Sequence, residues 1–315
     1  MDKTFAREPI YIVGPTGSGK SALAMKLARL LDGVIISADS MQIYKTLDIG
    51  TAKESIDNRQ EIHHEMIDIV PVDSEFSVAE YSLQARKHIN TALDNGKTPI
   101  IVGGTGLYFE SLFYPMSFGN TNKDEKVRAE LEDELNEKGA EYMHKRLEEI
   151  DKETADKLHV NDTRRVIRAL EIVICGGKTK TEMQDQRETP DVIVVGLNTD
   201  RAELYKRIDQ RVEIMFEQGL VDEVYSVGSF DYQSMKAIGY KEFADAIPTK
   251  IDGKFVLNKD DEDRVKALIQ KNSRNYAKRQ LTWFRRYNFV EWFDLYNTDE
   301  AVQYVLEQLK ARKNK

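Results

Sequence analysis

Short apolar runs alternate with longer helical stretches over the first hundred residues of the chain. The runs at 9–13 (PIYIV), 34–38 (VIISA) and 98–102 (TPIIV) are rich in β-branched residues and bounded by turn residues, which predicts buried strands. Between them, the segments 20–31 and 78–94 have the composition of helices. Strands that alternate with helices predict an α/β fold, in which helices cover both faces of a parallel sheet.

The pattern changes after about residue 114. The chain then carries only charged, helical sequence until an apolar run returns at 192–197 (VIVVGL). We therefore expect an inserted all-helical domain at 115–189, between a first part of the core at 1–114 and a second part at 190–315.

The second part of the core continues with more helices. We predict them at 201–218, at 220–227 and at about 260–284. The segment 248–259 (PTKIDGKFVLNK) is predicted to be a loop.

Composition adds that the chain folds and contains no membrane segment. Of its 315 residues, 41% are apolar and 32% charged, which is typical of a folded domain and not of a disordered one. No apolar run approaches the roughly 20 residues that span a bilayer, and the N-terminus does not look like a signal peptide. The single cysteine, Cys175, excludes an internal disulfide. We expect a cytoplasmic protein, and a monomer.

The net charge of −8 hides a local excess of basic residues. From 263 to 288 the chain has eight basic residues and one acidic one, and Arg164, Arg165 and Arg168 add a second group. Binding to nucleic acid depends on local fields and not on the sum of charges, so an acidic protein with one basic face is compatible with an RNA partner.

A phosphate-binding loop lies between the first predicted strand and helix. Residues 14–21 (GPTGSGKS) fit the pattern G-x-x-x-x-G-K-[ST] in the context that this pattern requires. Glycines let backbone N–H groups turn toward phosphate oxygens, Lys20 supplies a charge, and the Ser21 hydroxyl is a candidate Mg²⁺ ligand. The loop predicts a bound diphosphate or triphosphate, but not whether the phosphate is transferred, hydrolysed or released whole.

Two more predicted strands end in residues that suit a site. Asp39 follows the second strand, and ligands of open α/β sheets gather beyond the carboxyl ends of strands. Its carboxylate could hold Mg²⁺, accept a proton from a nucleophile, or merely cap a helix. At the third strand end, Gly103, Gly104 and Gly106 surround Thr105, which fits either a close approach to a ligand or a simple tight turn.

Together these segments resemble the tRNA dimethylallyltransferase family. The resemblance covers residues 12 to about 286 and is carried by seven segments in family order: GPTGSGKS, ISADSMQIY, VGGTGLY, NDTRRVIRALEI (161–172), DQRVEIMFEQGLVDEV (209–224), KAIGYKEF (236–243) and AKRQLTWFRR (277–286). Gly17 stands where the family commonly has alanine. The chain lacks the zinc-finger extension of eukaryotic members, so it resembles the bacterial form.

The resemblance implies a P-loop NTPase-like core and a set of residue roles. The loop would grip dimethylallyl diphosphate, the prenyl donor, through Gly14, Pro15, Thr16, Gly17, Ser18, Gly19, Lys20 and Ser21. Asp39 would be the general base, with Arg211, Lys20 and Thr16 as further catalytic residues and Mg²⁺ on Ser21. The partner would be the anticodon stem-loop of tRNA, with the following residues in contact with it: Asp39, Ser40, Met41, Gln42, Thr105, Arg164, Arg165, Val166, Ile167, Arg168, Lys236, Ala237, Ile238, Gly239, Tyr240 and Lys241.

The implied reaction moves a dimethylallyl group to the exocyclic amine of an adenosine next to the anticodon. Other readings of the residues remain open. In a P-loop small-molecule kinase, Arg164, Arg165 and Arg168 would form a lid over ATP and Arg211 a phosphate clamp. A prenyltransferase acting on free AMP or ADP and a non-enzymatic RNA-binding protein are two further alternatives. The large helical insert favours a large acceptor.

Overall fold

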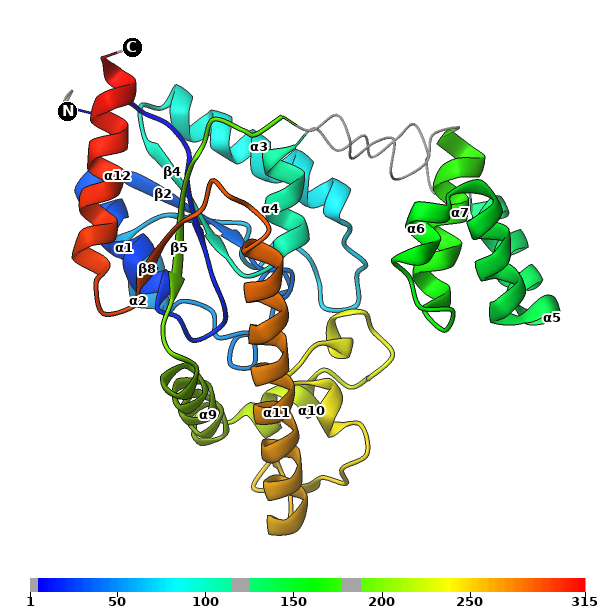
Figure 1. Cartoon of the computed structure of the whole chain (residues 1–315). Helices are drawn as coiled ribbons and strands as arrows, with labels where there is room; N and C mark the ends of the chain where they lie inside the picture. The colour runs from blue at the N-terminus through cyan, green and yellow to red at the C-terminus, as the bar shows by residue number, and fades with distance from the viewer. Residues whose placement is uncertain (1–4, 115–124, 177–187, 315) are drawn as a thin grey trace. The chain divides into compact units, whose positions relative to one another are not determined.

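A six-stranded parallel sheet forms the centre of the chain (Figure 1). The computed structural model describes residues 5–114, 125–176 and 188–314. The strand order is β3-β2-β4-β1-β5-β8. The strands are β1 (Ile10–Val13), β2 (Gly33–Ala38), β3 (His64–Glu65), β4 (Thr98–Gly103), β5 (Ile193–Asn198) and β8 (Glu291–Asp294). This arrangement confirms the predicted α/β fold.

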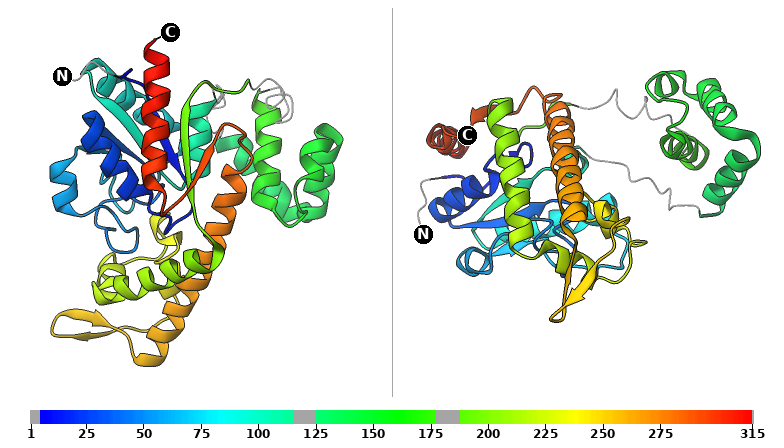
Figure 2. Two further views of the ribbon diagram at one scale, coloured as in Figure 1. Left: turned by 60° about the vertical axis from the view of Figure 1, so that its left-hand side comes forward. Right: turned by 90° about the horizontal axis from the view of Figure 1, so that it is seen from below.

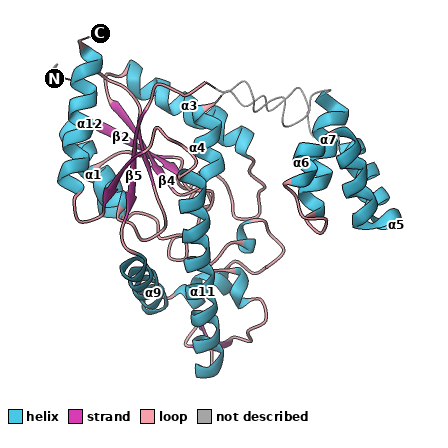
Figure 3. Cartoon of the chain, in the orientation of Figure 1, coloured by secondary structure: helices cyan, strands magenta, loops and turns pink. Residues whose placement is uncertain are grey.

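Helices cover both faces of the sheet (Figure 3). Side chains of β1 alternate between the two faces, as expected for a strand. Ile10 and Ile12 belong to one core cluster with α1 (Lys20–Leu31) and α12 (Thr298–Lys313). Tyr11 faces the opposite way, with its ring centre 5.1 Å from that of Phe113 in α4 (Gly106–Phe113).

On the α4 side, α3 (Val78–Asp94) packs along α4. The rings of Tyr81 and Tyr108 stack between these two helices, with centres 3.7 Å apart. A capping box at Ser77 and Glu80 fixes the start of α3. The short α2 (Ile56–Glu61) lies between β2 and β3 in the chain and buries no side chain.

The last third of the chain adds helices beyond the sheet (Figure 2). They are α9 (Arg201–Glu217), α10 (Leu220–Ser226), the short 3₁₀ turns η1 (Ser234–Lys236) and η2 (Lys241–Phe243), and the long α11 (Lys259–Phe284). Leu204 and Ile208 of α9 pack against Ala277 of α11, which holds the two helices together.

The prediction of a loop at 248–259 is wrong. A small antiparallel hairpin occupies this segment, with β6 (Thr249–Ile251) and β7 (Lys254–Val256). Asp252 and Gly253 between the strands both have positive φ, at 49° and 82°, as two-residue hairpin turns of this kind require.

The chain divides into two compact units, Met1–Phe113 with Asp191–Lys315, and Tyr114–Pro190. The second unit contains α5 (Glu125–Ile150), which has a non-helical residue at Gly139, with α6 (Lys152–Asp156) and α7 (Thr163–Gly176). Its helices share a core of their own around Leu131, Met143, Leu147, Val166 and Leu170. Among the described residues, no helix is long and apolar enough to cross a membrane.

Candidate active site

A cavity of about 510 Å³ opens beyond the carboxyl ends of β1, β2 and β4. Every residue that lines it belongs to the unit that contains the sheet. Its walls include the phosphate loop with the start of α1, the turn and loop after β2, the end of β4, one face each of α9 and α11, and the segment 236–241. Three strand ends that lie far apart in the sequence thus meet at one site, as the parallel sheet predicts.

The phosphate loop presents part of its length to the cavity. Its lining residues are Thr16, Gly17, Gly19, Lys20 and Ser21. The other residues of the loop do not line the cavity; they are Gly14, Pro15 and Ser18. A side chain at Gly14 would place Cβ 2.3 Å from the carbonyl oxygen of Leu197, so this position requires glycine. The hydroxyl of Ser18 is buried and has no hydrogen-bond partner within residues 5–114, 125–176 and 188–314, so it is available as a donor to an oxygen ligand.

Positive charge gathers at the loop. Lys20 donates a hydrogen bond from Nζ to the carbonyl oxygen of Pro15 at 2.6 Å. Burial and the nearby Arg211 guanidinium lower the pKa of Lys20, against the attraction of Asp39, to a net value of about 7. Burial also lowers the pKa of Arg211, again against the attraction of Asp39. The cavity therefore holds more cationic than anionic charge, and an anion is the ligand that would relieve it.

Helix α9 turns one face toward the loop. Arg207 and Arg211 are one helical turn apart and both line the cavity. Arg207 donates from Nε to the carbonyl oxygen of Gly17 at 2.9 Å, which anchors α9 to the phosphate loop. The family resemblance indicated Arg211 but not Arg207, although the four-residue spacing between the two arginines is a usable signal.

Asp39 lies in a turn that starts no helix, so the capping alternative is excluded. The N–H of Met41 donates to Asp39 Oδ1 at 2.8 Å, and the N–H of Ser40 donates to Thr105 Oγ1 at 3.0 Å. Gln42 accepts a hydrogen bond from the hydroxyl of Ser37 at 2.8 Å. The side chain of Asp39 is only partly buried, and the cavity wall includes it together with Ser40, Met41 and Gln42.

The segment 236–241 supplies another part of the wall, through Lys236, Ala237, Ile238, Gly239 and Lys241. Tyr240 is the exception, because it does not line the cavity, and its contact with tRNA stays a prediction. It is 0% exposed, and its hydroxyl donates to Glu223 at 2.8 Å.

The predicted RNA-binding stretch of the insert also divides into two kinds of residue. Arg164, Arg165 and Arg168 are exposed on α7. Val166 and Ile167 are 0% and 4% exposed in the core of the insert, where their side chains pack, and a contact of these two positions with tRNA stays a prediction.

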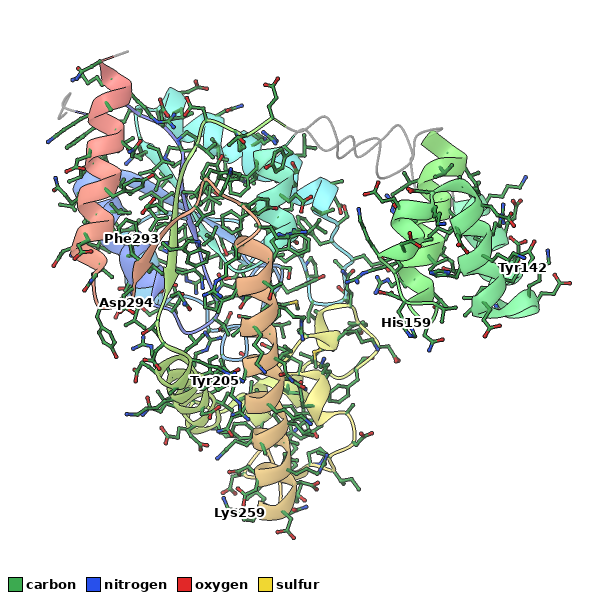
Figure 4. The ribbon with its side chains drawn as sticks, in the orientation of Figure 1. Tyr142, His159, Tyr205, Lys259, Phe293 and Asp294 are labelled. Atoms are coloured by element: carbon green, nitrogen blue, oxygen red, sulfur yellow. The ribbon has the colours of Figure 1, made fainter. Side chains whose placement is uncertain are left out.

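Within the part of the chain that the structure describes, four of the eight basic residues at 263–288 form ion pairs. Arg264 pairs with Asp261, Lys266 with Glu213, Arg274 with Asp209 and Arg286 with Glu110. The pair of Arg274 lies between α11 and α9, beside Tyr205, which Figure 4 labels together with Lys259 at the start of α11. Arg279 is different, because it lines the cavity.

The wall also offers oxygen ligands for Mg²⁺. Among the described residues there is no cluster of three or more His, Cys, Asp or Glu side chains that could hold a metal alone. Ser21 and Asp39 both line the cavity, and a hydroxyl with one carboxylate suits Mg²⁺, which is usually completed by substrate phosphates and water.

Comparisons with known proteins agree on one family. The model of the IPP transferase family matches residues 42–287. A tRNA dimethylallyltransferase of Bacillus anthracis is 43% identical over 312 residues, which cover 96% of this chain and 96% of that protein. The crystal structure of a tRNA isopentenylpyrophosphate transferase from Bacillus halodurans covers 98% of both chains, with 36% identity and a TM-score of 0.69. A eukaryotic dimethylallyltransferase acting on tRNA covers 92% of this chain and 74% of its own, with 28% identity and a TM-score of 0.75.

Proposed function

Because the chain belongs to the IPP transferase family, we propose that it transfers a dimethylallyl group from dimethylallyl diphosphate to tRNA. The acceptor is the exocyclic amine of an adenosine next to the anticodon, and diphosphate is released. The observation that carries this proposal is a single cavity with a cationic phosphate loop and the Asp39 carboxylate both in its wall. A diphosphate and an amine can meet there.

The departing diphosphate is the group that most needs stabilisation. As the bond between the allylic carbon and oxygen breaks, its electron pair stays on the diphosphate, and negative charge grows there. Lys20, Arg211 and the loop N–H groups would stabilise it, and Thr16 would contribute its hydroxyl. A leaving group stabilised more strongly in the transition state than in the ground state speeds the reaction.

The adenine amine is a weak nucleophile because its lone pair is delocalised into the ring. We assign Asp39 to orient this amine and to accept its proton once the new nitrogen–carbon bond forms. An adenine stacked in a paired stem cannot enter a cavity of this kind, whereas a base in a loop is flipped out at a cost of only a few kcal/mol. Single-stranded loops are also where proteins read RNA sequence.

The remaining parts of the proposal concern the surroundings of this reaction. Mg²⁺ would be held by Ser21 with the diphosphate, whose charge it would neutralise. We propose further that Ser40, Met41, Gln42 and the segment 236–241 contact tRNA, as do the exposed arginines of the insert. We propose a monomer, acting in the cytoplasm, where its substrate tRNA is found.

A direct labelling experiment tests the proposal. Labelled dimethylallyl diphosphate, Mg²⁺ and unmodified tRNA are incubated with the protein, with AMP, ADP or no acceptor in place of tRNA as controls. We expect label on tRNA alone. Label on AMP or ADP would indicate a prenyltransferase for free nucleotides. Phosphate transfer from ATP to a metabolite would indicate a kinase.

The role of Asp39 is tested by replacement with alanine. We expect Asp39→Ala to lower the single-turnover rate of prenyl transfer by roughly 10²–10⁴, the usual loss for a general base, with tRNA affinity within a few-fold of the original. Asp39→Asn, which keeps the shape but not the basicity, should lose as much. An unchanged rate in either variant would remove Asp39 from this role.

A further inference from the structure

Gln280 of α11 joins two loops that lie far from it in sequence. Its side chain is 4% exposed, and both ends of its amide are used. Oε1 accepts from the N–H of Thr16 in the phosphate loop at 2.9 Å, and Nε2 donates to the carbonyl oxygen of Gly104 at 2.9 Å. One buried amide thus connects the loop after β1 to the loop after β4.

Tyr276, one turn earlier on the same helix, extends this connection to the loop after β2. Its hydroxyl lies near the side chains of Thr105 and Gln280, both of which oppose the effect of burial on its pKa. Thr105 in turn accepts from the N–H of Ser40, the residue next to Asp39. Burial, with a contribution from the Asp39 charge, raises the pKa of Tyr276 to about 12, so its hydroxyl stays protonated at neutral pH.

The fit of α11 against the loop after β4 is close. A Cβ on Gly104 would lie 2.0 Å from Gln280 Nε2, and a Cβ on Gly106 would lie 2.3 Å from the ring of Trp283. Positions 276, 280 and 283 follow the spacing of one helix face. This face of α11 therefore fixes the position of the loop after β4. A looser fit between the two would displace residues that line the cavity.

Both side chains also line the cavity, beside the residues that we assign to the two substrates. We infer that Gln280, supported by Tyr276, is a positioning residue that fixes the phosphate loop relative to Asp39. It would thereby set the separation of the allylic carbon from the adenine amine. This inference rests on the proposed function. Displacement of reacting groups by about 1 Å can cost about 10²-fold in rate, so such a residue should affect the chemical step more than binding.

The chemistry of the amide selects the test variants. Gln280→Leu removes both hydrogen bonds. Gln280→Glu keeps the acceptor for Thr16 but sets a carboxylate oxygen against the carbonyl of Gly104. The matched control is Gln270→Leu on the same helix, because the amide of Gln270 bonds to Glu213 at 3.1 Å and does not line the cavity.

We expect both Gln280 variants to lower the single-turnover rate about 10- to 100-fold, with affinities for tRNA and inorganic diphosphate within about threefold of the original. Gln270→Leu should leave the rate unchanged. In the Asp39→Ala background, Gln280→Leu should cost much less than in the original protein, because residues that act as one unit are not additive.

Three results would overturn the inference. They are an unchanged rate in Gln280→Leu, a rate loss that adds fully to that of Asp39→Ala, and a loss of tRNA or diphosphate binding as large as the loss of rate. Thermal unfolding of each variant shows whether it is folded, and Tyr276→Phe, which removes a single hydroxyl, tests the same connection with less disturbance. If the unsubstituted protein transfers no prenyl group, the proposed function is refuted, and this inference with it.

Discussion

The surroundings of Lys20 indicate which kind of ligand the cavity binds. Its ammonium group is buried next to the Arg211 guanidinium, and these surroundings bring its pKa down to about 7. Without a bound anion, the amine therefore loses its proton above a pH of about 7, whereas an ordinary lysine amine has a pKa of 10.5. A bound diphosphate supplies the missing negative charge, and the pKa of Lys20 should rise again.

Proton uptake on binding follows from this shift. When inorganic diphosphate binds at pH 8, the Lys20 amine should take up a proton. The affinity for diphosphate should therefore fall as the pH rises above about 7. Calorimetry in buffers of different ionisation enthalpy measures the uptake. Lys20→Met provides the control, because the diphosphate's own titration is the same in both proteins. Equal uptake by the two proteins would contradict the low pKa of Lys20.

At the scale of elements, Glu223 of α10 holds a cavity loop in place. Its carboxylate accepts from the N–H groups of Asp48, Ile49 and Gly50 at 2.7–2.9 Å, and from the hydroxyl of Tyr240. One side chain thus supports the loop after β2 and the segment 236–241 together.

Removing that carboxylate should destabilise the protein. We expect Glu223→Ala to lower the free energy of unfolding by about 2–3 kcal/mol, since several donors lose a charged acceptor. Denaturant titration measures the change. Glu217→Ala, at an exposed position of α9, is the control and should be within about 0.5 kcal/mol of the original. Equal midpoints for the two variants would mean that water replaces the carboxylate without cost.

The elements also show what the sequence could predict. The central strands were found within about a residue of their ends, because short β-branched runs between turn residues are a strong local signal. The edge strands β3 and β8 and the hairpin were missed. Each is two to four residues long, and none has a fully buried residue. The Asp252–Gly253 pair was the available signal for the hairpin.

Contacts between segments that are distant in the sequence could be predicted only where a motif indicated them. The phosphate loop, Asp39 and Arg211 were predicted from motifs, and the cavity wall includes all three. Gln280 was part of a recognised segment but received no role. Its partners are 264 and 176 residues away, and nothing local indicates such hydrogen bonds. Val166, Ile167 and Tyr240 were assigned to RNA because a motif does not distinguish exposed residues from buried neighbours.

At the scale of the whole molecule, a net charge of −8 has to be reconciled with a polyanionic substrate. The basic residues near α11 are partly neutralised by ion pairs. On α7, Arg164 and Arg165 are exposed, and Arg165 pairs with Asp162 at 3.1 Å. Binding would then depend on a few local contacts with phosphates, surrounded by a surface that repels RNA.

Salt dependence measures this directly. The affinity for tRNA should fall steeply with salt, and Arg164→Ala/Arg165→Ala should reduce the slope of log K against log [salt] by about 1 for each phosphate that an arginine no longer neutralises. Lys87→Ala/Lys313→Ala changes the net charge equally at exposed positions elsewhere and should leave the slope almost unchanged. A slope near zero in the original protein would mean that these arginines do not contact RNA phosphates.

The position of β1 between β4 and β5 has a consequence for biosynthesis. When the ribosome has completed β4, one side of β1 is paired, but the strand that pairs with its other side is still to be made, after the entire helical insert. Until then the nascent chain carries β1 as an open edge, and open edges invite pairing with other chains. Slow translation of the insert would prolong that exposure, and the newly made chain would depend on chaperones most during this interval.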